Sequence, residues 1–233
     1  MISKLRRLDR IAAALIAALL CACAAQTGAG GGSTSRENRD THGPDDVAKY
    51  IAGLESDARV ADLDPPVVLA KLALEPNAVV ADIGCGPGVF SLRFARALPR
   101  GVVNAVDVEP KQLDALRGQL LAGGFENVVP VLASYSTPHL PPASCDLIFI
   151  ADTYHHIDDR VEYMRKLQRV LRRGGRLALL EYKPGPLPVG PPPEHKLAEG
   201  EMERELSEAG WTRSERFDTH KNHSFEIWVP AAR

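Results

Sequence analysis

The chain has 233 residues, of which 45% are hydrophobic and 25% charged, and its formal net charge is −2. These values suit one globular domain of moderate size with tails, and the near-balanced charge excludes an overall basic field that attracts nucleic acid. No basic stripe interleaved with aromatic residues is present either, so we expect no nucleic-acid partner.

The first 23 residues have the pattern of a bacterial secretion signal. A basic stretch, "MISKLRRLDR", precedes the uncharged apolar run "IAAALIAALL". This run is shorter than the about 20 residues of a membrane-spanning helix but suits the core of a signal peptide. Residues 20–23, "LCAC", resemble a lipobox in which Cys23 is lipidated. We expect a membrane-anchored lipoprotein of the cell envelope if this signal is used. The alternatives are an uncleaved anchor or a start placed too far upstream, and without the lipobox we expect a cytoplasmic protein.

Residues 24–46 are rich in Gly, Ser, Thr and charged residues and show no apolar period. That composition favours a flexible linker, which would hold a folded domain away from the membrane. A leader without a function of its own is the alternative. We expect the folded domain at 47–233.

Helical and strand patterns alternate from residue 47 onward. The helix expected at 89–98, for example, carries Phe90, Phe94 and Leu98 at four-residue spacing, which places them on one face. In this first half we expect helices at 47–56, 66–74, 89–98 and 111–121, and strands at 78–82, 101–107 and 128–133.

The second half continues the alternation. The apolar run "DLIFIA" at 146–151 predicts a strand that is covered on both faces. A helix follows, capped by Asp158 and closed by the run "RRGG" at 172–175. Strands are then expected at 176–182, 212–217 and 225–229, with a surface loop at 183–195 and a helix at 197–209. The whole pattern predicts an α/β fold with a doubly wound, mostly parallel seven-stranded sheet and helices on both faces.

The stretch "VVADIGCGPGVF" at 79–90 contains three alternate glycines, Gly84, Gly86 and Gly88. Ligands of doubly wound sheets bind beyond the carboxyl ends of the strands, and glycine lets the backbone approach a ligand closely. Asp82 precedes the glycines, and its carboxylate would repel a pyrophosphate but suits a positively charged group. The spacing also differs from the G-x-G-x-x-G of dinucleotide sites, and no G-x-x-x-x-G-K-[ST] is present.

A second acid, Asp107, ends the next predicted strand. An acid at this place accepts hydrogen bonds from ribose hydroxyls. The two acids together indicate a nucleoside ligand with a positive group and no phosphate. S-adenosylmethionine contains an adenosine, a sulfonium and an ammonium, so we expect it as the cofactor rather than NAD or ATP.

These residues resemble those of class I S-adenosylmethionine-dependent methyltransferases. "VVADIGCGPG" is similar to the first motif of that family, "VNAVDVEPKQLDAL" to its second-strand motif with the ribose acid, and "LRRGGRLALLEY" to the strand after its "LxPGG" turn. The resemblance covers about 47–230. "DTYHHIDDR", "GPPPEHK" and "FDTHKNHSFEIW" are also similar to a bacterial subgroup without an assigned substrate.

The resemblance implies which residues contact the cofactor. Gly84, Gly86 and Gly88 would line the methionine part with Asp82 nearby, Asp107 would hold the ribose, Val108 would pack on the adenine, and Asp152 would close the methionine pocket. Members of the family often have an Asp after the third strand for the adenine amine, where this chain has "ASYSTPHL". Ser134, Tyr135 or Ser136 would replace it, or the backbone alone would hold the adenine.

Candidates for the chemistry follow the fourth predicted strand, where acceptors lie in this fold. Methyl transfer depends chiefly on positioning, and an oxygen or nitrogen acceptor can also need a base. We expect Tyr154 or His155 to be catalytic. Alternatively, both only shape the acceptor pocket while His156 packs under the sheet edge. His195, in the Pro-rich loop, and His223 are more remote candidates. Glu181 at the end of the fifth strand either faces the acceptor or is only a charged strand end.

The leading hypothesis is a methyltransferase that acts on a small or lipid-like acceptor. The second is a non-catalytic cofactor-binding or degenerate module that is tethered to the membrane. An NAD-dependent oxidoreductase is disfavoured by the glycine spacing and by Asp82. Cys85 and Cys145 lack partners at metal-ligand spacing, so we expect no metal site.

Overall fold

The structure, a computed structural model, describes residues 46–232. The expected signal at 1–23, with Cys23, and the expected linker up to residue 45 lie outside the described residues, so both stay predictions. Between residues 46 and 232, no helix is both long and apolar enough to cross a membrane.

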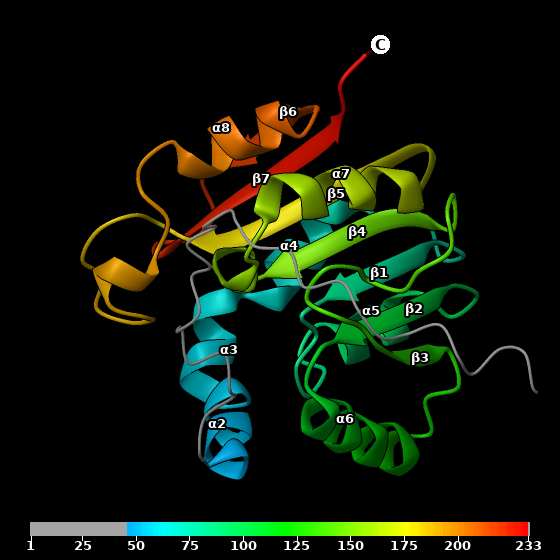
Figure 1. Cartoon of the computed structure of the whole chain (residues 1–233). Helices are drawn as coiled ribbons and strands as arrows, with labels where there is room; N and C mark the ends of the chain where they lie inside the picture. The colour runs from blue at the N-terminus through cyan, green and yellow to red at the C-terminus, as the bar shows by residue number, and fades with distance from the viewer. Residues whose placement is uncertain (1–45, 233) are drawn as a thin grey trace, which may run out of the picture. The chain divides into compact units, whose positions relative to one another are not determined.

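Seven strands form one sheet, shown in Figure 1. They are β1 (Val79–Ile83), β2 (Val102–Asp107), β3 (Val128–Leu132), β4 (Cys145–Ala151), β5 (Leu171–Tyr182), β6 (Trp211–Phe217) and β7 (His223–Pro230). Their order is β3-β2-β1-β4-β5-β7-β6, with β1 to β5 parallel and β7 antiparallel to both β5 and β6. The predicted doubly wound, mostly parallel seven-stranded sheet is therefore confirmed.

The strand order reverses between β1 and β4. From β1 the chain proceeds outward through β2 to β3, and then returns to the other side of β1 as β4. Asp82 pairs with Phe149 and Ile83 with Ile150, so the carboxyl ends of β1 and β4 are level. In an open α/β sheet, this reversal creates the crevice in which ligands bind.

Helices cover both faces of the sheet. On one face, the Phe90 and Phe149 ring centroids lie 4.6 Å apart between α5 and β4. On the other face, Met164 of α7 and Leu206 of α8 are fully buried with Ile150. The helices are α2 (Val47–Leu54), α3 (Asp57–Leu63), α4 (Pro65–Leu72), α5 (Ser91–Ala97), α6 (Pro110–Gly123), α7 (Arg160–Val170) and α8 (Glu201–Glu208), with short 3₁₀ helices η1 (Tyr154–His156) and η2 (Pro193–His195). Burial of apolar side chains on both faces stabilises the sheet.

The first helical segment differs from the prediction. The sequence predicts one helix at 47–56, whereas α2 ends at Leu54 and a separate helix, α3, begins at Asp57. Ser56 caps α3, because its hydroxyl accepts a hydrogen bond from the Arg59 N–H at 3.4 Å. A short break thus separates the two helices, and Figure 1 shows α2 and α3, in blue and cyan, one after the other beyond one end of the sheet.

The boundary between α7 and β5 also differs from the prediction. Asp158 does not cap α7; Asp159 precedes its first residue without a capping hydrogen bond from its side chain, and the helix ends at Val170. Leu171 already pairs with Cys145 of β4, and a register shift follows. The "RRGG" run therefore lies within the bounds of β5, at the register shift between Leu171 and Arg176, and follows the end of α7.

Candidate active site

A glycine turn, residues 84–88, follows β1 and lies against the loop after β4. Gly84 has a φ of +71°, and a Cβ added there would lie 2.3 Å from Thr153 Cγ2. The N–H groups of Gly84 and Cys85 donate hydrogen bonds to Val106 O at 2.8 and 3.1 Å. Only glycine tolerates a left-handed backbone this close to a neighbouring side chain. The turn is thus fixed between the ends of β2 and β4, where the strand order reverses.

The rest of the glycine turn has two different neighbours. Gly86 lies beside the carboxylate of Asp107, as described next. Gly88 has a φ of +106°, and a Cβ there would lie 2.5 Å from Leu116 Cδ1. Gly88 therefore packs the turn onto α6, and its predicted contact with the methionine part of the cofactor stays a prediction.

Asp107 ends β2 and binds the glycine turn. Its carboxylate accepts hydrogen bonds from the N–H groups of Gly86 at 2.8 Å and Glu109 at 2.9 Å. Burial raises the pKa of this carboxyl, and the N–H groups of Glu109 and Gly86 oppose that shift. A carboxylate offers about four lone-pair positions, so Asp107 retains the capacity to accept ribose hydroxyls.

Asp82 lies beneath the glycine turn. Its residue is 2% exposed, and its carboxylate accepts a hydrogen bond from Ser91 Oγ at 2.6 Å. Burial raises the pKa of Asp82 to about 7; the Ser91 hydrogen bond opposes this shift and the charge of Asp107 adds to it. A positive group in the crevice would favour the ionised carboxylate. Asp82 can therefore lose its proton when a cation enters.

Asp152 follows β4 in a left-handed conformation, with a φ of +47°. Its Oδ2 lies 2.9 Å from Arg59 Nη2, and its Oδ1 lies 3.0 Å from His223 Nε2. One carboxylate thus joins α3 to the start of β7. A left-handed backbone costs a residue other than glycine about 1–2 kcal/mol, which the surrounding contacts must offset. Strain of this kind is common at ligand-binding sites.

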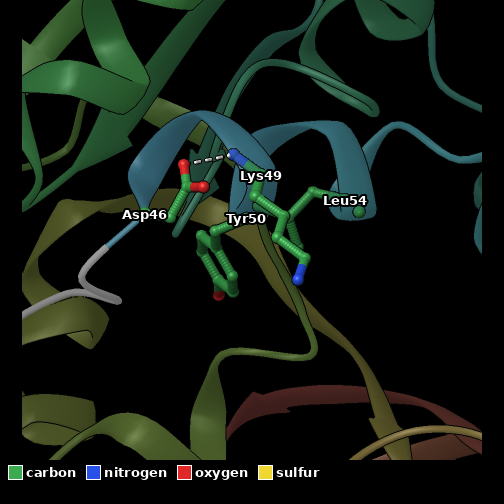
Figure 2. A pocket seen from close by; sticks show the side chains of 5 residues that line it. Asp46, Lys49, Tyr50 and Leu54 are labelled. Carbon is green, nitrogen blue, oxygen red and sulfur yellow. Dashed lines mark hydrogen bonds between the residues drawn. The ribbon is translucent and has the colours of Figure 1, made fainter.

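The helix α2 covers the glycine turn. Leu54 Cδ1 would lie 3.4 Å from a Cβ at Gly86. Burial raises the pKa of Tyr50, and the charge of Arg59 opposes this shift. The carboxylates of Asp107 and Asp152 add to the shift, so both acids interact electrostatically with Tyr50. Figure 2 shows the Tyr50 ring pointing away from α2. An open hollow of about 390 Å³ beside it is lined by Asp46, Lys49, Tyr50, Gly53 and Leu54.

The predicted adenine contacts lie beside the end of β3. The N–H of Ala133 donates a hydrogen bond to Asp107 O at 2.9 Å, which brings the loop after β3 next to Asp107. Ser134 is half-buried, and Tyr135 is 58% exposed. Val108, directly after Asp107, is also half-buried. All three lie at this edge of the sheet, and their contacts with an adenine stay predictions.

His155 and Glu181 form a buried pair on the other side of the crevice. Their side chains are 5% and 3% exposed, and His155 Nδ1 lies 2.8 Å from Glu181 Oε1. Glu181 also accepts hydrogen bonds from the N–H groups of Tyr182 at 2.9 Å and His155 at 3.3 Å. A carboxylate oxygen at this distance accepts a hydrogen bond from an N–H on Nδ1, and in the tautomer that donates it, Nε2 keeps its lone pair. An imidazole oriented in this way can accept a proton.

Tyr154, the other predicted catalytic residue, is fully buried. Its hydroxyl donates a hydrogen bond to Glu205 Oε2 of α8 at 2.9 Å, and the Arg160 guanidinium lies over its ring. Burial and the adjacent Glu205 raise the pKa of the phenol. These contacts favour a packing role over the predicted role as a base. His156 is exposed, so the expectation that it packs under the sheet edge is wrong.

The structure brings Gly84, Asp107 and Asp152 together at the carboxyl ends of neighbouring strands. Sequence reasoning missed Tyr50 and Arg59, which α2 and α3 bring to the same place. Nothing in the local pattern distinguishes either residue from an ordinary surface side chain. Their roles depend on long-range packing, which the helix pattern alone does not reveal.

The residues present fit S-adenosylmethionine. The buried Oδ1 of Asp152 makes no hydrogen bond, so it can accept one from an ammonium group. Asp82 and Asp107 add carboxylates that suit a cation and a diol, not a phosphate. Within the part of the chain that the structure describes, no group of three or more His, Cys, Asp or Glu residues could hold a metal ion.

Comparison with known proteins supports this interpretation. A family model described as a methyltransferase domain matches residues 80–175, which include the glycine turn, Asp107 and Asp152. Over 121 residues the chain is 34% identical to the ubiquinone/menaquinone biosynthesis C-methyltransferase UbiE of Hahella chejuensis, covering 51% of this chain and 49% of the relative. It is 32% identical to the 27-O-demethylrifamycin SV methyltransferase of Amycolatopsis mediterranei, covering 51% of this chain and 44% of the relative. The chain thus spans about half the length of the curated relatives it matches.

Solved structures extend the likeness over most of the described domain. A SAM-dependent methyltransferase from Aquifex aeolicus aligns with a TM-score of 0.73 and 26% identity. The alignment covers 79% of this chain and 99% of that one. The whole sheet and its helices therefore have the Rossmann-like methyltransferase fold.

Proposed function

Residues 80–175 carry a methyltransferase domain of the class I S-adenosylmethionine-dependent type, and from this premise we propose that the chain transfers a methyl group to a small or lipid-like acceptor. The observation that carries the proposal is the meeting of the glycine turn with Asp107 and Asp152 at the reversal of strand order. Three carboxylates around a close backbone turn suit a cationic nucleoside and do not suit a phosphate.

In this proposal, different residues of the crevice bind different parts of the cofactor. Asp107 accepts hydrogen bonds from the ribose hydroxyls. Val108, Ser134 and Tyr135 border the adenine. Asp152 accepts hydrogen bonds from the ammonium group, while Asp82 adds negative charge beneath the turn. When bound, S-adenosylmethionine supplies an activated methyl group on a sulfonium, so the protein has only to position the acceptor and exclude water.

His155 is the proton acceptor in this proposal. An acceptor with an O–H or N–H group becomes a better nucleophile when its proton moves to His155 Nε2. The imidazolium that results is stabilised by Glu181, whose Oε1 lies 2.8 Å from Nδ1. Glu181 holds the imidazole in one orientation and is itself held by two backbone N–H groups, from which it accepts hydrogen bonds.

Calorimetric titration of the full chain with S-adenosylmethionine tests the cofactor assignment. We expect one-to-one binding, and the absence of binding at millimolar ligand would refute it. The transfer itself is tested with cofactor labelled in its methyl group, incubated with separate water-soluble and lipid fractions of a bacterial extract. Label in the lipid fraction alone would assign a lipid-like acceptor.

The alternative is a non-catalytic cofactor-binding module tethered to the membrane. Two features favour it. The predicted signal at 1–23 would export the domain away from cytosolic S-adenosylmethionine, and the loop after β3 lacks the acidic residue that often binds the adenine amine in this family. This alternative predicts cofactor binding without transfer of label to any fraction. Labelled product in either fraction would exclude it.

The position of the protein in the cell is a separate proposal. We infer from "LCAC" at 20–23 that Cys23 becomes the lipidated N-terminus of a membrane-anchored lipoprotein. Mass spectrometry of the mature N-terminus would detect a diacylglycerol-modified Cys23. An intact Met1 would contradict lipidation.

A further inference from the structure

A buried polar cluster joins α3 to the carboxyl edge of the sheet. We call Arg59, Asp62, Asp152, Asn222 and His223 the α3 cluster. Arg59 and Asp62 come from α3, Asp152 follows β4, and the other two residues lie at the start of β7. Asn222 Nδ2 donates a hydrogen bond to Asp62 Oδ1 at 2.6 Å. Three separate segments of the chain thus meet beside the predicted methionine pocket.

His223 lies at the centre of this cluster. Its side chain is 0% exposed and stands between two carboxylates. Nε2 lies 3.0 Å from Asp152 Oδ1, and Nδ1 lies 3.6 Å from Asp62 Oδ2. The ring also packs on Tyr182, with the ring centroids 4.4 Å apart. Both the position and the orientation of the imidazole are therefore determined by its neighbours.

The contact between His223 and Asp152 is not a completed hydrogen bond. The two atoms are close enough for an ion pair, yet Asp152 Oδ1 and both ring nitrogens of His223 lack a well-aligned hydrogen-bond partner. Buried polar atoms are rarely left in this state, and the exceptions often occur at ligand sites. Asp152 Oδ1 thus has lone pairs available for a further donor.

Arg59 and His223 hold the two oxygens of Asp152 from different sides. Arg59 Nη2 contacts Oδ2 at 2.9 Å, and His223 Nε2 contacts Oδ1 at 3.0 Å. The Arg59 hydrogen bond at one oxygen and the close His223 contact at the other restrict rotation of the carboxylate, which lowers the entropic cost of binding a ligand. Because each oxygen has two lone pairs, both contacts leave a lone pair for an ammonium group.

We propose that His223 is a positioning residue, which orients the Asp152 carboxylate towards the ammonium group of the cofactor. This inference rests on the proposed function. His223 acts through Asp152 and does not itself touch the cofactor. Asp62 holds the other side of the imidazole ring, so that Nε2 faces Asp152.

The test compares two ligands on one variant of the full chain. His223→Phe keeps a ring against Tyr182 but removes both nitrogens. S-adenosylhomocysteine carries the ammonium group, whereas methylthioadenosine has the same nucleoside without it. We expect the variant to bind S-adenosylhomocysteine about tenfold to a hundredfold more weakly than the wild type, which corresponds to one lost charge-assisted interaction. Its affinity for methylthioadenosine should stay within about threefold of the wild type.

Two further variants separate positioning from packing. His220 is a matched control: its residue is 5% exposed, it belongs to the same turn, and its Nε2 lies 3.0 Å from Leu63 O of α3 without touching a carboxylate. His220→Phe should lower the melting temperature but leave the preference for S-adenosylhomocysteine over methylthioadenosine intact. His223→Gln keeps one N–H donor and should recover most of that preference.

The outcomes distinguish this inference from the proposed function. If wild-type protein binds neither ligand, the proposed function fails and the inference fails with it. If wild-type protein binds both ligands and His223→Phe weakens them equally, only the positioning role is refuted. If His223→Phe does not fold, Asp62→Ala, which removes the contact with Nδ1 from a partly exposed side chain, takes its place: a weakened preference for S-adenosylhomocysteine supports the role, and an unchanged preference contradicts it.

Discussion

The glycine turn with Asp107 and the pair of His155 with Glu181 lie at the carboxyl ends of neighbouring parallel strands but are held in different ways. Main-chain hydrogen bonds from residues 84–86 to the end of β2 fix the donor side. The acceptor side depends on side chains that η1 and β5 bring together. A site held by backbone tolerates few changes of shape, whereas a site held by side chains can change chemistry without a change of fold. The donor side should therefore control binding and the acceptor side should control rate.

The largest effect is expected on the acceptor side, at His155. His155→Phe removes the proposed proton acceptor, so the transfer rate to an O–H or N–H acceptor should fall about a hundredfold to ten-thousandfold. The dissociation constant for S-adenosylmethionine should stay within about threefold, because His155 does not bind the cofactor. The rate is measured with labelled cofactor and the affinity by calorimetry.

The exposed neighbour His156 provides the control for this prediction. His156→Phe changes the same short helix without removing the contact with Glu181, so the rate should change less than about threefold. An equal loss of rate in both variants would show that η1 is only structural.

The next effect tests the backbone of the donor side. Gly84→Ala combines a left-handed φ with a Cβ 2.3 Å from Thr153, so the free energy of unfolding should fall by about 2–4 kcal/mol. Cofactor affinity should fall by about a hundredfold, because the turn must shift. Chemical denaturation and calorimetry measure the two quantities.

Gly174→Ala is the matched control for Gly84→Ala. Gly174 also has a positive φ, +81°, but a Cβ there meets nothing within 4 Å. Gly174→Ala should lower the free energy of unfolding by only about 1 kcal/mol, the cost of backbone strain, and should not change cofactor affinity. Equal losses at both positions would mean that the fit between the turn and Thr153 is unimportant.

A smaller effect is expected from the ribose acid. Asp107→Asn replaces one acceptor oxygen by an NH₂ group, and affinity for S-adenosylhomocysteine should fall about tenfold to a hundredfold. A 2′,3′-dideoxy analogue should bind wild-type and variant protein equally well by calorimetry. Asp114→Asn, which alters an exposed carboxylate paired only with Arg117, is the control and should have no effect. A preference for the natural ribose that survives in Asp107→Asn would disprove the assignment.

The smallest effect concerns pH. Asp82 has a pKa of about 7 in the free protein, and the cationic cofactor favours its ionised form. As the pH falls below 7, binding must remove a proton from Asp82, so affinity should fall by up to about tenfold per pH unit. Calorimetry from pH 8 to pH 5.5 should show this slope, and Asp82→Asn should flatten it. A wild-type affinity that does not change over this range would show that ionisation of Asp82 is not coupled to ligand binding.

The same contrast explains how much the sequence could predict. The seven-stranded sheet, the glycine turn and the place of Asp107 follow from local patterns, because a strand, a turn and an acid are neighbours in the chain. The break at Ser56 and the contact of Arg59 with Asp152 do not, since a helix pattern shows which face is apolar but not where the helix packs. The burial of Tyr154 against Glu205 likewise depends on α8, which comes later in the chain.

The most direct test of the central claim is a crystal structure of the full chain with S-adenosylhomocysteine. Our account predicts the ribose hydroxyls within hydrogen-bond distance of Asp107 and the ammonium group within hydrogen-bond distance of Asp152, with the glycine turn against the ligand. A ligand bound elsewhere on the molecule, or a crevice in which Asp107 and Asp152 do not contact it, would contradict the account.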